Sequence, residues 1–262
     1  MPGSSAPRVS PALVARLRAA GCVFAEDEAR LLVAAARSPA ELDALVAQRV
    51  AGAPLEPLLG WAEFCGLRLV VAPGVFVPRR RTELLVREAA LLARPGAVVV
   101  DMCCGSGAIG AALAAAVDRP ELHAVDVEPA AVRCARRNVE RLGGHVYEGD
   151  LFDPLPGGLR GRVDLVVANA PYVPTDAIAT MPPEARLHEP RVTLDGGADG
   201  LDVQRRVIAE AGRWLAPDGH LLVETSQGQA VRTAAIFAAH GLDARIARSD
   251  ELDGTVVVGR VR

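Results

Sequence analysis

The residues with the clearest chemical potential form one short motif, Asn169-Ala170-Pro171-Tyr172. It follows residues 163–168, an apolar run rich in valine that is typical of a buried strand. The Asn169 side-chain oxygen and the Ala170 carbonyl could each accept one N–H of a planar NH2 group, on which Tyr172 could stack, while Pro171 fixes the turn. We therefore expect the motif to hold a primary amide or an exocyclic amine, with its nitrogen facing a reaction partner.

A second motif, Asp101-Met102-Cys103-Cys104-Gly105-Ser106-Gly107, leads from another apolar run into an alanine-rich stretch. Gly105 and Gly107 lack a Cβ, so the backbone can turn tightly and a ligand can approach it closely. Asp126 ends the next apolar run, where a carboxylate can accept both hydroxyls of a ribose. These features predict a nucleotide-type cofactor whose contacts include Asp101, Cys103, Cys104, Gly105, Ser106, Gly107 and Asp126.

The nature of this cofactor depends on Asp101. Gly105, Gly107 and Gly110 also spell the GxGxxG pattern of dinucleotide-binding oxidoreductases. The carboxylate of Asp101 would, however, repel the pyrophosphate of a dinucleotide, whereas the ammonium and sulfonium of S-adenosylmethionine would suit it. The sequence therefore favours S-adenosylmethionine over a dinucleotide, and over a tight turn without a ligand.

Methyl transfer to an amide nitrogen would explain why both motifs are needed. An amide lone pair is delocalised into its carbonyl and is a poor nucleophile. Holding both amide hydrogens and aligning the nitrogen with the sulfonium supplies a proximity effect of up to roughly 7–11 kcal/mol. No side-chain base is required, because the nitrogen can lose its extra proton once it carries the methyl group. Asn169 is expected to border the cofactor as well as the acceptor.

Helical and strand patterns alternate along the chain from residue 82 onward. Two helices are predicted at 82–92 and 129–142, and three more are predicted to begin at Gly107, near Asp199 and near Gln227. The predicted strands span 98–101, 122–127, 163–168, 220–224 and 255–261. This alternation predicts an α/β fold with a mostly parallel sheet covered by helices on both faces. Ligands of such sheets bind beyond the carboxyl ends of the strands, which is where both motifs fall.

Residues 1–54 are predicted to form a small helical domain, and residues 55–262 the α/β domain. Ser10-Pro11 and Ser38-Pro39 each place a capping residue before a proline at the first helical position, and Glu41 completes a capping box with Ser38. Two prolines and two glycines in 52–60 predict a linker, and a short hairpin is predicted at 61–64 and 67–71, which makes 55–78 a hairpin linker region. The helical domain could be a packing appendage or a substrate-docking module.

Composition excludes several classes of function. With 262 residues there is room for one α/β domain and a small appendage, but not for a second catalytic domain. The net charge of −3 disfavours a nucleic-acid partner, and the five cysteines form neither a CxxC pair nor a zinc-ligand set with histidine, so no metal site is expected. No apolar run reaches the roughly 20 residues of a membrane span, and residues 1–10 lack the features of an export signal. We expect a cytoplasmic protein without a membrane partner.

From about Gly52 to its end, the chain resembles the protein N(5)-glutamine methyltransferases that modify peptide chain release factors. The motifs that carry the resemblance are Cys103 to Gly107, Asp126, Asp150-Leu151, Asn169 to Tyr172, Glu189-Pro190, Gly196-Gly197 and Asp199 to Leu201. The resemblance implies the Rossmann-like sheet of class I S-adenosylmethionine-dependent methyltransferases, with an antiparallel C-terminal strand. It also implies that Asp126 binds the ribose and that Asp150 and Leu151 border the adenine. Asn169 to Tyr172 would hold a glutamine amide of a protein substrate, a release factor.

Three departures from the family pattern mark a divergent branch. Cys103 stands in place of the first glycine of the turn, and Ala170 in place of the first proline of NPPY, where it keeps the carbonyl but loosens the turn. Arg80-Arg81 replaces the proline and aspartate of a PRPDTE segment. We interpret these arginines as solvated charge at a helix start rather than as contacts for an acidic or RNA-bearing partner. His188 beside Glu189 is interpreted as ordering a loop rather than as an acid/base pair.

Two other functions are compatible with the same motifs. Methyltransferases that act on exocyclic amines of RNA or DNA use a similar turn, although a nucleic-acid reader needs a stripe of basic residues that the near-neutral charge does not favour. A module that binds S-adenosylmethionine without turnover would keep the fold and yield no methylated product.

Overall fold

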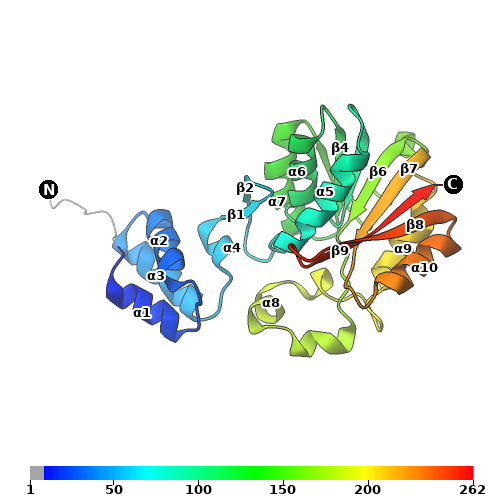
Figure 1. The fold of residues 1–262 in the computed structure, drawn as a ribbon. Helices are drawn as coiled ribbons and strands as arrows, with labels where there is room; N and C mark the ends of the chain where they lie inside the picture. Colours follow the sequence, from blue (N-terminus) through cyan, green and yellow to red (C-terminus); the bar gives the residue numbers. More distant parts are fainter. Residues whose placement is uncertain (1–8, 262) are drawn as a thin grey trace.

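The N-terminal part of the chain is a small helical bundle (Figure 1). The structure is a computed structural model that describes residues 9–261. Residues 1–8 and residue 262 lie outside the described residues, and residues 1–8 are part of the stretch assessed above for an export signal. The bundle consists of α1 (Pro11–Ala19), α2 (Ala25–Ala35) and α3 (Pro39–Val50). Ser10 and Ser38 cap α1 and α3 by accepting backbone N–H groups at 3.2 Å, which confirms both predicted helix starts.

The segment predicted as a linker is helical instead. Helix α4 (Leu55–Leu59) ends at Gly60, whose φ of 79° places it in the left-handed region. Leu55 and Leu59, four positions apart, pack against the hydrophobic cluster of the bundle. The sequence did not predict this helix, because it depends on apolar contacts that outweigh the turn tendency of the flanking glycines. The division of the chain at residue 54 stays a prediction.

The hairpin follows directly and matches its prediction. Strands β1 (Trp61–Phe64) and β2 (Leu67–Val70) pair antiparallel over four residue pairs. The Asn138 side chain accepts a hydrogen bond from the Val70 amide at 2.9 Å, which attaches the hairpin to helix α7 (Pro129–Val139). The hairpin is therefore part of the body that carries the sheet.

The rest of the chain builds one seven-stranded sheet in the order β5-β4-β3-β6-β7-β9-β8. The strands are β3 (Val98–Met102), β4 (Glu121–Asp126), β5 (His145–Glu148), β6 (Val163–Ala168), β7 (Leu215–Glu224), β8 (Leu242–Ser249) and β9 (Gly254–Val261). Strands β3 to β7 are mutually parallel, and β9 lies antiparallel between β7 and β8. The predicted fold class is confirmed, including the antiparallel strand near the C-terminus.

Helices cover both faces of the sheet (Figure 1). One core layer contains residues of α5 (Glu83–Leu92), α6 (Ala108–Ala116) and α7, and the other contains residues of α9 (Asp202–Ala211) and α10 (Ala230–Ala239). Short 3₁₀ segments occur at Arg80–Thr82, Glu140–Leu142, Gly157–Leu159, Thr175–Thr180 and Arg191–Thr193. None of the helices between residues 9 and 261 combines the length and apolarity needed to cross a bilayer.

Strands β3 and β6 are neighbours, and their pairing places the two sequence motifs side by side. Met102 of β3 pairs with Ala168 of β6, so the turns that follow these residues emerge at the same edge of the sheet. This is also where the order of strands reverses, the position at which open α/β sheets bind ligands. The long connection from β6 to α9 carries helix α8 (Pro183–His188) beyond that edge (Figure 1).

Candidate active site

A cavity of about 330 Å³ opens between the turn after β3 and the turn after β6. Of the residues predicted from sequence, it is lined by Cys103, Cys104, Gly105, Ser106, Asp126, Asp150, Leu151, Asn169, Ala170, Pro171 and Tyr172. The structure therefore brings the cofactor motif and the acceptor motif into one cavity. Asp101 and Gly107 do not line it.

The turn after β3 is held in a left-handed conformation at three positions. Cys103, Gly105 and Gly107 have φ values of 56°, 55° and 75°. A side chain in this region costs on the order of 1–3 kcal/mol, so Cys103 adopts the left-handed conformation at a cost in strain. A Cβ at Gly107 would lie 2.7 Å from Val139 Cγ2 of α7, so this glycine serves helix packing rather than cofactor contact.

Asp101 has a different role from the one predicted. Its side chain is fully buried, and its Oδ2 accepts the Gly110 amide of helix α6 at 2.8 Å. Burial, with a smaller contribution from the charge of Asp126, raises the pKa of Asp101 to about 7, although the hydrogen bond from Gly110 opposes the shift. Asp101 does not line the cavity, so the structure does not support the predicted direct contact with the cofactor. The carboxyl group anchors the start of the helix that follows the turn.

Asp126 lines the cavity and accepts hydrogen bonds from the cofactor turn. Its Oδ2 accepts the Gly105 amide at 2.8 Å, and its Oδ1 accepts the Glu128 amide at 2.9 Å. Burial raises the pKa of this carboxyl. Each carboxylate oxygen can accept a second hydrogen bond, so these contacts leave room for the two ribose hydroxyls, and the ribose role of Asp126 stays a prediction.

The wall next to Asp126 is formed by Asp150 and Leu151. Asp150 makes an ion pair with Arg206 of α9 at 2.6 Å, whereas Leu151 is buried with a φ of 47°. An apolar side chain held in this way can cover one face of a flat ring. Arg206, which sequence reasoning missed, lines the same wall.

The acceptor turn is fixed through Asn169. The Asn169 Nδ2 donates to the Thr82 hydroxyl at 3.3 Å. Within residues 9–261 no donor hydrogen-bonds to the Asn169 side-chain oxygen, which is thus available to accept an N–H of a bound group. Thr82 is buried and precedes α5, an element that the sequence did not connect with the turn.

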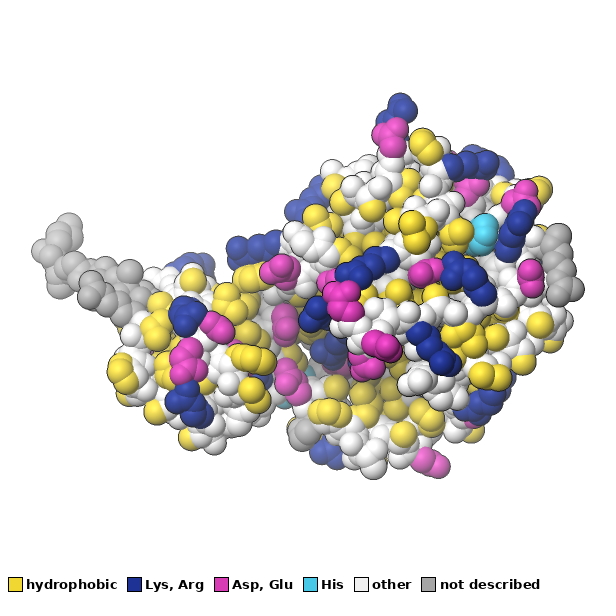
Figure 2. Space-filling model, viewed as in Figure 1, with side chains coloured by type: hydrophobic (Ala, Val, Ile, Leu, Met, Phe, Trp, Pro, Cys, Tyr) yellow, Lys and Arg dark blue, Asp and Glu magenta, His cyan; other side chains and the backbone are white. Residues whose placement is uncertain are grey.

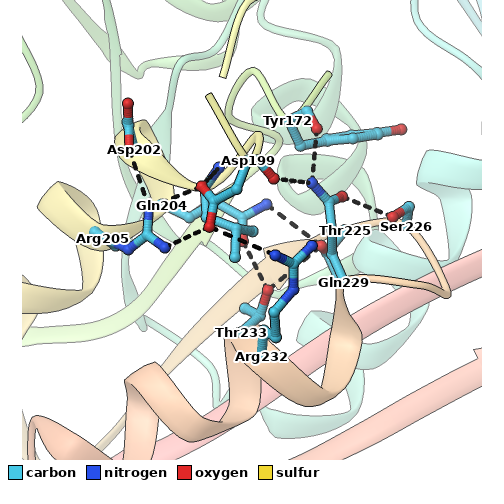
Figure 3. Close-up of polar contacts among 11 residues, drawn as sticks. Tyr172, Asp199, Asp202, Gln204, Arg205, Thr225, Ser226, Gln229, Arg232 and Thr233 are labelled. Atoms are coloured by element: carbon cyan, nitrogen blue, oxygen red, sulfur yellow. Dashed lines mark hydrogen bonds and ion pairs between the residues drawn. The ribbon is translucent and has the colours of Figure 1, made fainter. Parts of the chain in front are cut away.

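The backbone of Tyr172 is held by the Gln229 side chain, as Figure 3 shows. The Gln229 amide donates to the Tyr172 carbonyl at 2.9 Å and to the Asp199 carbonyl at 3.1 Å, and its oxygen accepts the Ser226 hydroxyl. Gly200 packs against the same carbonyl, since a Cβ there would lie 2.3 Å from the Tyr172 oxygen. The segment around Asp199 therefore braces the acceptor turn.

Two arginines near the cavity are paired with buried carboxylates. Arg79 forms an ion pair with Glu189, which ties the loop after α8 to the turn before α5 and gives Glu189 the loop-ordering role predicted for this region. Arg81 lies 3.4 Å from Glu224 and lines the cavity, so its interpretation as solvated charge was wrong. Arg80 does point into solvent, with 72% of its side chain exposed.

Comparison with known proteins identifies the family. Residues 66–194 match the family described as Methyltransferase small domain. A release factor glutamine methyltransferase of Geobacter sulfurreducens is 42% identical over 86% of this chain and 80% of its own length. The chain belongs to the release factor glutamine methyltransferase family. It is an enzyme, and S-adenosylmethionine is its cofactor.

Two further proteins place this methyltransferase among its relatives. A 4-amino-L-phenylalanine/4-methylamino-L-phenylalanine methyltransferase of Streptomyces pristinaespiralis is 39% identical over 75% of this chain and 69% of its own length. A methyltransferase from Pyrococcus furiosus has a TM-score of 0.57 at 16% identity, covering 74% of this chain and 89% of that chain, and shows the same fold.

The cavity of the methyltransferase fits its cofactor. Its volume falls within the roughly 300–1,000 Å³ of small-molecule sites. Asp126 offers carboxylate oxygens at the rim, Leu151 offers an apolar surface, and the backbone at Gly105 carries no side chain that would narrow the cavity. These residues would hold the ribose, the adenine and the amino-acid part of the cofactor respectively.

We predict that Asp126→Asn weakens binding of S-adenosylmethionine by about tenfold or more, because a charged acceptor of hydrogen bonds is lost. Calorimetric titration with the cofactor measures the dissociation constant. Asp153→Asn removes an exposed carboxylate from the turn after β5 and is the matched control, with affinity expected within about twofold of the wild type. Equal affinities for the wild type and Asp126→Asn would place the ribose elsewhere.

We predict a pH dependence of stability that originates at Asp101. The folded protein keeps this proton up to a pH of about 7, whereas the unfolded chain releases it near the ordinary value of 3.8. The folded state therefore binds more protons between these values, so the free energy of unfolding falls as pH rises through the window, by up to about 1.4 kcal/mol per pH unit. Asp101→Asn removes this fall relative to the wild type.

Urea denaturation of the cofactor-free proteins between pH 5 and 8 measures the effect. The difference in unfolding free energy between Asp101→Asn and the wild type should grow in favour of the variant up to a pH of about 7 and then level off. Asp153→Asn, with an exposed side chain, should run parallel to the wild type. Parallel curves for all three proteins would show that Asp101 titrates normally.

Proposed function

We propose that this methyltransferase transfers a methyl group from S-adenosylmethionine to the side-chain amide nitrogen of a glutamine in a peptide chain release factor, in the cytoplasm. The observation that carries the proposal is the position of Asn169 and Tyr172 in the same cavity as Asp126 and the turn after β3. The name of the relative from Geobacter sulfurreducens supports the choice of acceptor.

The residues of the acceptor turn would hold the amide in a reactive position. The cofactor supplies an electrophilic methyl group on its sulfonium. The Asn169 side-chain oxygen and the Ala170 carbonyl accept the two N–H hydrogens of the amide, and Tyr172 lies against its plane. This arrangement points the nitrogen at the cofactor side of the cavity, with a proximity effect of up to roughly 7–11 kcal/mol. The methylated nitrogen then loses its extra proton, so no side-chain base is needed.

The charges at the cavity support a protein acceptor rather than a nucleic acid. Arg79 and Arg81 line the cavity, but each is paired with a buried carboxylate, Glu189 or Glu224. On the face drawn in Figure 2, arginines are interspersed with acidic side chains and form no continuous stripe. Nucleic-acid binding relies on unpaired basic groups that release counterions, so this surface is poorly suited to it.

A small aromatic amine is the second candidate acceptor. The relative from Streptomyces pristinaespiralis is named for 4-amino-L-phenylalanine and its methylamino derivative, and it is nearly as similar as the release factor enzyme. An arylamine presents a planar NH2 group, as an amide does, so the same turn could hold it. Only the product distinguishes the two acceptors.

We predict a methylated glutamine when the enzyme is incubated with isotopically labelled S-adenosylmethionine and a release factor. Mass spectrometry of the digested release factor should show one added methyl on a single glutamine. A release factor with that glutamine replaced by asparagine is the control and should gain no label. Label on 4-aminophenylalanine or on RNA in parallel reactions, with none on the release factor, would overturn the proposal.

We predict that Asn169→Ala lowers turnover by roughly a hundredfold or more, comparable to about 2.7–4 kcal/mol for a lost active-site hydrogen bond. Affinity for S-adenosylmethionine, measured by calorimetry, should change much less. Asp176→Ala changes an exposed residue of the same connection and is the matched control. Near-normal turnover of Asn169→Ala would exclude the residue from the mechanism.

A further inference from the structure

The side chain of Tyr172 needs support of its own. Gln229 donates to the carbonyl of Tyr172 (Figure 3), and Gly200 packs against the same carbonyl, but neither contact involves the tyrosine ring. A ring that must lie flat against an amide has to be held in one orientation. At the other end of the ring, the Tyr172 hydroxyl donates to Glu224 Oε1 at 3.3 Å.

Glu224 is placed for this contact by the sheet. It is the last residue of β7, paired with Val256 of β9, and its side chain is only 2% exposed. The Gln204 amide also donates to the Glu224 backbone carbonyl at 3.3 Å. The carboxylate is therefore carried by a rigid element at the same edge of the sheet as the acceptor turn.

The environment of Glu224 is unusual for a purely structural residue. One carboxylate oxygen receives both the Tyr172 hydroxyl and Arg81 Nε, whereas the other is buried without a partner among residues 9–261. Burial raises the pKa of this carboxyl. A neutral or apolar side chain would be less costly to bury here if packing alone were required.

Arg81 is the charge that makes the buried carboxylate tolerable. The guanidinium of Arg81 approaches Glu224 from the 3₁₀ turn at Arg80–Thr82. Strand β9 packs closely against this turn, because a Cβ added at Gly254 would lie only 2.7 Å from the Arg81 carbonyl oxygen. Arg81 is one of the departures from the family pattern. In this chain the aspartate of that pattern would place a second negative charge beside Glu224.

We propose that Glu224 is a positioning residue for methyl transfer: it orients the Tyr172 ring through the tyrosine hydroxyl, with Arg81 as its counter-ion. The inference rests on the proposed function of the acceptor turn. Glu224 does not line the cavity, so it acts through Tyr172 and not on the acceptor itself. The alternative is that the Arg81–Glu224 ion pair has only a structural role and stabilises the packing of the turn before α5 against the sheet.

A double-mutant cycle separates these two roles. Glu224→Met removes the acceptor at nearly constant length, Tyr172→Phe removes only the hydroxyl, and the third protein carries both changes. Each single variant should lower kcat by about tenfold to a hundredfold, as expected when a hydrogen bond to a charged group is lost, with the cofactor dissociation constant within about twofold of the wild type. The double variant should be no slower than the slower single variant, because both changes remove one interaction.

Two further variants sharpen the result. Glu224→Gln keeps an oxygen that can accept the hydroxyl and should restore much of the activity lost in Glu224→Met. Glu251→Gln is the matched control, because Glu251 is an exposed glutamate that pairs with Arg80 and Arg87 in the same corner. Its kcat should stay within about twofold of the wild type. Multiplicative losses in the cycle, or no recovery in Glu224→Gln, would overturn the proposal.

Crystal structures of the wild type and Glu224→Met, each with bound cofactor, provide a readout that does not depend on the acceptor. The Tyr172 ring should keep one orientation in the wild type and leave it in the variant. An unchanged ring in Glu224→Met would overturn the positioning role. Failure of the wild type to methylate a release factor would instead overturn the proposed function, while the crystallographic comparison would still decide the role of Glu224.

Discussion

The parallel pairing of β3 with β6 is the constraint on which the site depends. It sets Met102 beside Ala168, and with them the two turns that carry cofactor and acceptor residues. Because parallel strands cannot be joined by a tight turn, each strand is followed by a crossover, and the loops at the carboxyl edge are free to carry chemistry. Both strands are buried on both faces, so this register is fixed by the core and not by the loops.

Buried carboxyl groups surround the cavity that this register creates. Among residues 9–261, the buried side-chain oxygens that lack a hydrogen-bond partner belong to Asp101, Glu189 and Glu224. Unsatisfied buried polar atoms are rare in folded proteins, and here all three lie close to the site. Asp126 lines the cavity, and its carboxylate suits a cofactor that carries ammonium and sulfonium charges. Arg79 and Arg81 balance the two glutamates on the acceptor side.

The sequence predicted those parts of the fold in which the local pattern of apolar residues matches their burial in the folded domain. The apolar runs that became β3, β4 and β6 are central strands, and their identity follows from composition alone. Strands β5 and β8 were missed because they lie at the two edges of the sheet. β5 is short, and in β8 charged residues interrupt the apolar ones. Helix α4 was missed because its stability comes from packing of leucines against a bundle that local sequence does not reveal.

The candidate site was predictable where a residue type and its chain position define its role. Asp126 and Asn169 each end a strand, which places them at the carboxyl edge whatever the tertiary contacts are. Asp101 was misassigned because its position in the sequence does not show that its carboxyl faces α6. Glu224 could have been found by the same rule as Asp126, since it too is an acidic residue that ends an apolar strand. Thr82 and Gln229 could not, because their contacts join segments far apart in the sequence.

Ala170 stands where the resemblance predicts a proline, so the acceptor turn lacks the local stiffness of that residue. A proline restricts its own backbone and that of the residue before it, so losing one widens the range of conformations open to the turn. In this chain the turn is restrained at three other points: Asn169 at Thr82, the Tyr172 hydroxyl at Glu224 and the Tyr172 carbonyl at Gln229. Each partner is buried and belongs to a different segment of the chain, namely the turn before α5, the end of β7 and the start of α10. The geometry of the acceptor turn is therefore a property of the assembled domain, so changes in segments far from it in sequence can alter how it holds the acceptor.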